Sequence, residues 1–128
     1  MADVNRGNRP LSPHLTIYKP QINSMMSILH RVTGVGLTLG AILGVWWFLA
    51  AASGPAYFAV VDGLVTSWIG GLIMLLSMFA LWYHFFTGVR HLFWDAGFGF
   101  DLDMVDKSSY AVIGAAAVMS LITLFVAF

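Results

Sequence analysis

Residues Gly63–Val89 read GLVTSWIGGLIMLLSMFALWYHFFTGV, and this stretch contains no Asp, Glu, Lys or Arg. A helix rises about 1.5 Å per residue, so about 20 apolar residues cross the hydrocarbon core of a bilayer. Two other uncharged stretches are also long enough, Val32–Ala52 and Ser108–Phe128. Soluble helices seldom stay uncharged for so long. The sequence therefore predicts an all-α integral membrane protein with three transmembrane helices, at about 29–52, 64–93 and 107–128.

The composition agrees with this fold class and excludes several functions. Of the 128 residues, 59% are hydrophobic and 9% are charged, whereas soluble domains carry about 25% charged residues. The net charge is zero, so no basic surface indicates a nucleic-acid partner. The chain has no cysteine, which excludes disulfides, Cys-held iron–sulfur clusters and covalently attached haem.

The chain has room for one membrane domain, residues 1–128, and for no soluble catalytic domain. Residues 1–26 form an N-terminal arm in which Pro10, Pro13 and Pro20 prevent one continuous helix. We expect this arm to lie along the membrane surface, in contact with lipid, or against a partner protein.

The distribution of positive charge predicts the orientation. All six Lys and Arg lie before the first span or at the ends of the second connection, which places the N-terminus in the cytoplasm and the Ser53–Asp62 loop outside. The first 20 residues contain no apolar run and no Arg-rich presequence. We therefore expect a bacterial inner membrane rather than a mitochondrial one. The six residues are Arg6, Arg9, Lys19, Arg31, Arg90 and Lys107.

The second predicted span carries a histidine inside the hydrocarbon. His84 precedes Arg90 by six residues, which places it roughly 9 Å deeper than that interfacial residue. Ionisable residues at such depth are costly and usually functional, although a neutral histidine bonded to a neighbouring helix also fits. His84, Gly88 and His91 share one helical face. A flat macrocycle could lie there, with its iron on His84 and its polar edge toward His91. A zinc site would need further ligands.

A second polar cluster, Ser27, His30 and Arg31, opens the first span. Its side chains converge on one helical face and offer donors beside apolar surface, which suits a quinone or haem propionates. An interfacial Arg facing lipid phosphate and a capping Ser are the structural alternative. The topology places this cluster and His84–His91 at the same membrane face.

Further along the first span, Gly36, Gly40 and Gly44 form a GxxxGxxxG row, which favours helix packing over direct cofactor contact.

Two longer motifs resemble a known family. The first runs Arg9-Pro10-Leu11-Ser12-Pro13-His14-Leu15, then Ile17-Tyr18-Lys19, then Ser27-x-x-His30-Arg31-x-Thr33-Gly34. The second is His84-x-x-x-Gly88-Val89-Arg90-His91-Leu92-x-x-Asp95. Both resemble signatures of the cytochrome b556 subunits of succinate dehydrogenase, or complex II. They occur in the same order, and the resemblance covers nearly the whole chain.

The resemblance implies a role for each matching residue. His84 would be an axial ligand of haem b, whose other ligand comes from a second small membrane anchor subunit packed in the same helical bundle. Ser27 and Arg31 would belong to the ubiquinone site. His30, Arg31 and His91 would be partners or neighbours of the haem propionates.

The resemblance also implies partner subunits and an activity. An iron–sulfur subunit would dock near the N-terminal arm, and a separate flavoprotein would oxidise succinate. This chain would then pass electrons to ubiquinone as a subunit that does not itself oxidise succinate. Two other interpretations stay open: the anchor of a quinol:fumarate reductase working in the opposite direction, and a non-redox scaffold or small transporter subunit in which His84 only packs.

Overall fold

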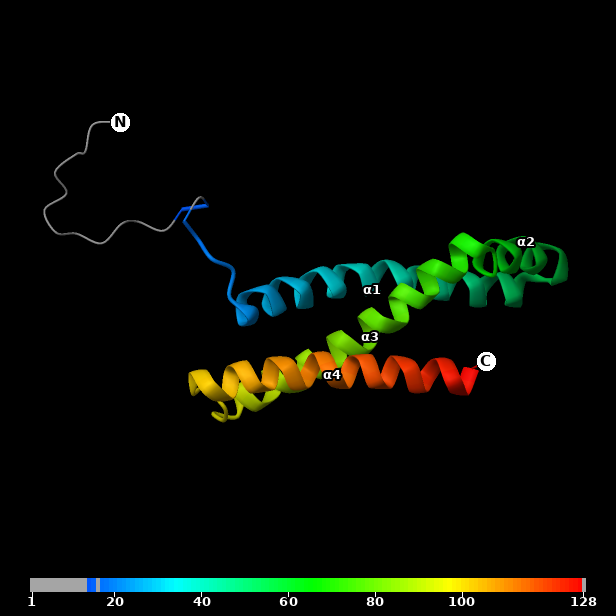
Figure 1. Ribbon diagram of the computed structural model, residues 1–128. Helices are drawn as coiled ribbons and strands as arrows, with labels where there is room; N and C mark the ends of the chain where they lie inside the picture. Colours follow the sequence, from blue (N-terminus) through cyan, green and yellow to red (C-terminus); the bar gives the residue numbers. More distant parts are fainter. Residues whose placement is uncertain (1–13, 16, 128) are drawn as a thin grey trace, which may run out of the picture.

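The structure is a computed structural model that describes residues 14–15 and 17–127. Its helices α1, α3 and α4 are each long and apolar enough to cross a membrane, which confirms the predicted all-helical fold with three candidate spans. Figure 1 shows these helices lying alongside one another, with the short helix α2 connecting the end of α1 to the start of α3. The bounds are α1 (Ile22–Ser53), α2 (Pro55–Val65), α3 (Trp68–Asp95) and α4 (Leu102–Ala127).

The connection between α1 and α3 is itself helical, which the sequence analysis did not predict. Gly54 ends α1 with φ +133°, a conformation that favours glycine. Pro55 then opens α2, where its missing N–H costs nothing. The Ser53–Asp62 segment was expected to be a loop, but most of it belongs to the 11-residue helix α2. Helix α2 is fastened to α1 by the Trp47 indole, which donates to Asp62 over 3.0 Å.

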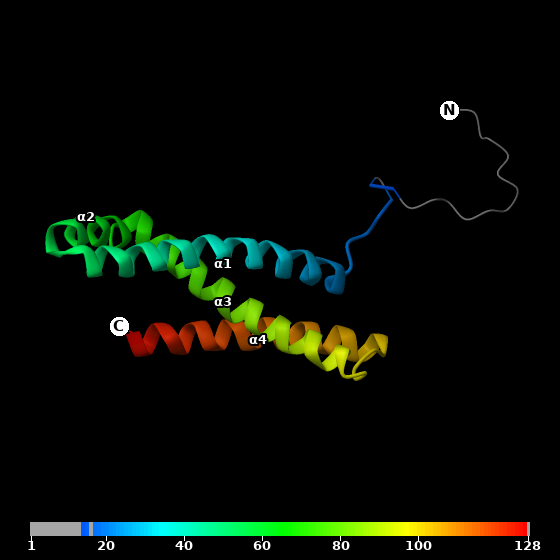
Figure 2. The same cartoon turned by 180° about the vertical axis from the view of Figure 1, so that it is seen from behind.

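The helices alternate in direction. Figures 1 and 2 show that α1 and α4 begin, and α3 ends, at one end of the molecule, with α2 at the other. We call the first of these the basic end, because it carries every Lys and Arg among the described residues. These are Lys19, Arg31, Arg90 and Lys107. Arg6, Arg9 and most of the N-terminal arm lie outside the described residues.

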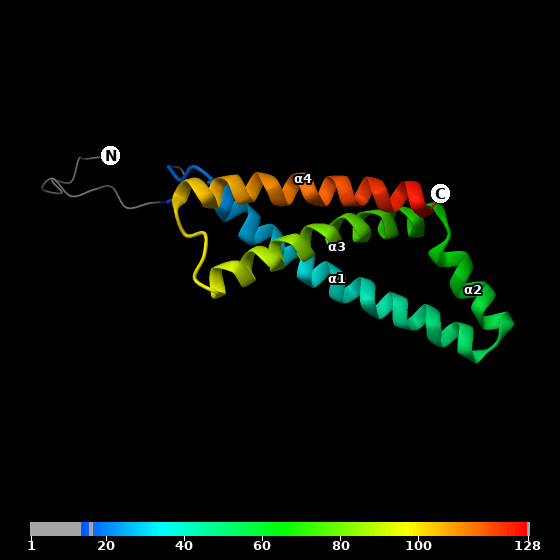
Figure 3. The same ribbon diagram turned by 90° about the horizontal axis from the view of Figure 1, so that it is seen from below.

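Helix α3 packs against both α1 and α4 (Figure 3). The Tyr83 hydroxyl donates to the Met26 carbonyl of α1 over 2.9 Å, and both residues are buried. On the side of α4, the Trp82 indole donates to the Thr123 hydroxyl over 2.9 Å. A small core joins the three helices; its buried members are Met26, Tyr83, Val112 and Ala116.

Most large apolar side chains face outward from this core. Leu39 and Leu76, near the middles of α1 and α3, are each 61% exposed. Exposed apolar surface is unfavourable in water by about 25 cal/mol per Å². An apolar exterior around helices whose backbone groups are bonded internally is the arrangement that suits lipid or a further membrane subunit.

Candidate functional site

Three histidines from two helices meet toward the basic end. The ring of His30 on α1 stacks on that of His84 on α3, with centroids 4.0 Å apart and an interplanar angle of 7°. His30 also stacks on His91, with centroids 4.9 Å apart. His84 and His91 share a face of α3 because they are seven residues apart. The structure thus brings together the two clusters that topology alone placed at one membrane face.

The hydrogen bonds of His84 define which ring nitrogen is free. Its Nδ1 lies 3.0 Å from the His30 carbonyl oxygen and 3.2 Å from the Thr33 hydroxyl. A carbonyl can only accept a hydrogen bond, so Nδ1 carries the proton and Nε2 keeps its lone pair. No hydrogen bond engages Nε2 within the described part of the chain. A neutral imidazole held through Nδ1–H is the form in which histidine ligates haem iron, so His84 fits that role.

Gly34 allows the close approach of His84 to α1. A Cβ atom at Gly34 would lie 3.1 Å from Cε1 of His84, tighter than an ordinary contact. Thr33 and Gly34 belong to the first motif, but no role was predicted for either of them. Their position about one turn after His30, on the helix expected to face His84, is the sequence feature that could have indicated a role.

The other glycines of α1 do not lie as close to a neighbouring side chain as Gly34 does. A Cβ at Gly40 would lie 3.7 Å from the Ser77 hydroxyl, an ordinary contact, whereas Cβ atoms at Gly36 and Gly44 would meet nothing within 4 Å. Of the three glycines in the expected packing row, only Gly40 thus meets another helix among the described residues. A Cβ at Gly88, between His84 and His91, would also meet nothing within 4 Å among the described residues.

His30 and His91 differ in how their nitrogens are satisfied. The Nδ1 of His91 donates to the Thr87 carbonyl over 2.7 Å. The Nδ1 of His30 is buried and has no hydrogen-bond partner within the described chain. Leaving a buried polar group unpaired costs about 1–3 kcal/mol. The Nδ1 of His30 is therefore an unsatisfied polar atom enclosed by neighbouring atoms of the chain itself. The stacked rings do not form a protein-only metal site: among the described residues, no three His, Cys, Asp or Glu gather around one point.

Ser27 and Arg31 flank His30 on α1. Ser27 is partly buried and Arg31 is exposed. Neither side chain has a hydrogen-bond or ion-pair partner among the described residues, and no hydrogen bond links them to His84 or His91. Both remain available to a ligand outside this chain.

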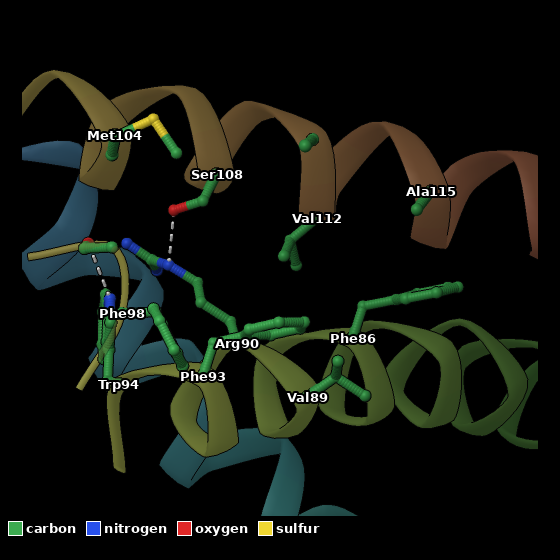
Figure 4. A pocket seen from close by; sticks show the side chains of 12 residues that line it. Phe86, Val89, Arg90, Phe93, Trp94, Phe98, Met104, Ser108, Val112 and Ala115 are labelled. Atoms are coloured by element: carbon green, nitrogen blue, oxygen red, sulfur yellow. Dashed lines mark hydrogen bonds between the residues drawn. The ribbon is translucent and has the colours of Figure 1, made fainter. Parts of the chain in front are cut away.

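A cavity of about 360 Å³ lies between α3 and α4 (Figure 4), and no histidine lines it. Its wall includes Arg90, which is only 6% exposed. The guanidinium donates to the Ser108 hydroxyl over 2.9 Å and to the Val105 carbonyl over 3.0 Å, and it stacks on Trp94. Arg90 was expected to bound the loop, but α3 continues to Asp95 and Arg90 joins α3 to α4. Because Arg90 is already bonded within the chain, we place the candidate site at the histidines rather than at this cavity.

The fold and the site define the class of this protein: a multi-span membrane protein with a histidine cluster between its helices. Comparison with known proteins identifies the family within that class. The family described as "Succinate dehydrogenase/Fumarate reductase transmembrane subunit" matches residues 5–123. The chain therefore belongs to this family, as the two motifs indicated.

Individual relatives agree with the family assignment. The succinate dehydrogenase cytochrome b556 subunit of Paracoccus denitrificans is 49% identical over 128 residues, covering 100% of this chain and 98% of the relative. The protein of the same name from Rickettsia bellii is 43% identical, with 82% of each chain covered. A succinate dehydrogenase cytochrome b560 subunit from Reclinomonas americana is 38% identical over 90% of this chain and 83% of the relative.

Proposed function

We propose that this chain is a membrane anchor of succinate dehydrogenase that binds haem b and helps to form the ubiquinone-reduction site. The observation that carries the proposal is the state of His84, whose Nδ1–H is held by α1 while Nε2 is left free. Membership of the family and the cytochrome names of the relatives support haem b as the group that Nε2 ligates.

His84 would hold the haem iron through Nε2, and a second ligand would come from another subunit. His30 lies parallel against the His84 ring at 4.0 Å, so it would not serve as that second ligand. His30, His91 and Arg31 are candidates for polar contacts at the rim of the haem, where its propionates would need charged or hydrogen-bonding partners. When bound, the haem supplies a one-electron redox centre.

Ser27 and Arg31 bind the quinone at the start of α1. The Ser27 hydroxyl donates a hydrogen bond to a quinone carbonyl. Arg31 donates as well, and its fixed positive charge stabilises the negative charge that builds on a quinone oxygen during reduction. Their lack of partners within the described chain supports this assignment.

Electrons enter from partner subunits, since this chain has no cysteine for an iron–sulfur relay. We place the iron–sulfur subunit at the basic end, beside the quinone residues, with the flavoprotein beyond it. The positive charges orient this end toward the cytoplasm of a bacterial inner membrane. An anchor of a fumarate reductase would use the same architecture, because the family includes both enzymes. Identification of the native quinone distinguishes the two directions.

The test is the haem content of the assembled complex carrying His84→Ala. We expect the reduced-minus-oxidised absorption of haem b to be lost or strongly altered, with the flavin content used to normalise the amount of complex. Leu76→Ala, an outward-facing residue on the same helix, serves as the control and should keep the signal. An unchanged spectrum and haem content in His84→Ala would show that His84 only packs, as in a non-redox scaffold.

A further inference from the structure

We propose that Thr33 is a positioning residue that holds the His84 imidazole and lowers the redox potential of the iron bound to it. This inference rests on the proposed function, because it requires His84 to be a haem ligand. It assigns a task to a side chain that lies on a different helix from the ligand and does not itself reach the haem iron.

The geometry around the Thr33 hydroxyl fixes the direction of each hydrogen bond. Its oxygen lies 2.8 Å from the Leu29 carbonyl oxygen, 2.9 Å from the His30 carbonyl oxygen and 3.2 Å from Nδ1 of His84. The hydroxyl has one proton, and both carbonyls can only accept. The proton therefore points to a carbonyl, and a lone pair of the hydroxyl oxygen faces Nδ1–H.

Two acceptors from α1 thus share the Nδ1–H of His84: the His30 carbonyl at 3.0 Å and the Thr33 hydroxyl at 3.2 Å. Hydrogen bonds accepted from the far nitrogen of a ligating histidine orient its ring and make the ligating nitrogen more basic. A more basic ligand stabilises ferric over ferrous iron and lowers the potential. Removing one of the two acceptors should therefore raise it.

A simpler role for Thr33 is ordinary bonding of a helical threonine to the carbonyl one turn earlier. Thr38, on the same helix, makes that bond, to the Gly34 carbonyl over 3.0 Å, and has no hydrogen bond to a histidine among the described residues. Comparing the two threonines separates the effect of losing such a bond from the effect of losing the contact with Nδ1 of His84.

The experiment uses the purified whole complex carrying Thr33→Val, Thr33→Ser or Thr38→Val, with haem content measured first and the haem midpoint potential second. Valine keeps the shape of threonine without the hydroxyl, and serine keeps the hydroxyl. We expect Thr33→Val to favour ferrous iron by roughly threefold to tenfold, which raises the potential by about 30–59 mV for a one-electron couple. Thr33→Ser and Thr38→Val should keep the wild-type potential.

Three outcomes overturn the inference. They are an unchanged potential in Thr33→Val with full haem content, equal shifts in the valine and serine variants of Thr33, and the same shift in Thr38→Val. Loss of haem in Thr33→Val together with a wild-type potential in Thr33→Ser supports it, because the hydroxyl is then needed to hold His84. A failure of the haem assignment itself would appear separately, as haem retained in His84→Ala.

Discussion

The imidazole rings of His30 and His84 lie parallel, with centroids 4.0 Å apart and planes inclined by 7°. The same two residues are joined again by the bond from Nδ1 of His84 to the His30 carbonyl. One residue of α1 thus contacts the proposed ligand through both its ring and its backbone. The position of α1 along α3 therefore determines the orientation of His84.

Gly34→Ala should disturb this arrangement. The added Cβ would lie 3.1 Å from Cε1 of His84, so the ring must move by a few tenths of an ångström, and overpacking of this kind typically costs about 1–3 kcal/mol. We expect reduced haem content or a shifted haem spectrum in the purified complex. Gly71→Ala on α3, where a Cβ meets nothing within 4 Å, is the matched control. A wild-type spectrum and content in Gly34→Ala would show that the contact is not critical.

Arg31→Leu should lose much of the succinate-to-ubiquinone activity, and Ser27→Ala should lose less at saturating quinone. A hydrogen bond to a charged group contributes about 1.5–3 kcal/mol, which is roughly one to two powers of ten in affinity or rate. The measurement is quinone reduction by membranes or purified complex.

The control for these variants is succinate oxidation with a dye that accepts electrons before the quinone. This activity should survive in both variants, because the flavin and iron–sulfur centres belong to other subunits. Wild-type quinone reduction in both variants would exclude Ser27 and Arg31 from the site. A parallel loss of dye activity would mean that they hold the complex together.

The orientation can be tested with single cysteines, since the chain has none. Ser53→Cys, at the exposed end of α1, should react with an impermeant thiol reagent from the periplasmic side. Asp106→Cys, exposed near the start of α4, should react only from the cytoplasm. Ser108 is a poorer reporter because it accepts a hydrogen bond from Arg90. Labelling of Asp106→Cys from outside would reverse the proposed topology.

Arg90→Leu should weaken the packing of α4 on α3. It removes two hydrogen bonds from a charged donor and a stacking contact with Trp94. Each such bond is worth about 1.5–3 kcal/mol. We expect a lower melting temperature of the complex, with haem retained in the surviving complex because neither hydrogen bond of Arg90 reaches His84. An unchanged melting temperature would contradict this role.

The three spans could be predicted because the length of a stretch without charged residues can be read from that stretch alone. The convergence of His30 with His84 and His91 followed from the order of the spans. Helix α2 was missed because an apolar segment directly after Gly54-Pro55 was interpreted as a short loop.

The contacts of Thr33, Gly34 and Arg90 depend on how the helices cross. The spacing of residues within one helix does not predict that crossing. Arg90 was interpreted as interfacial because a charged residue close to a loop usually faces water or lipid headgroups. In the structure it instead bonds to the Val105 carbonyl of α4, an acceptor that no sequence pattern identifies.

The fastening of α2 to α1 gives α1 two fixed points. Trp47 is held at the far end by Asp62, and His30 is held toward the basic end by the histidines. Trp47 follows His30 by 17 residues, which corresponds to about 26 Å of helix. A tilt of about 5° around Trp47 would therefore move the His30 ring by roughly 2 Å, about half the stacking distance. The two contacts together therefore hold α1 against such a tilt and keep the His30 ring stacked on that of His84.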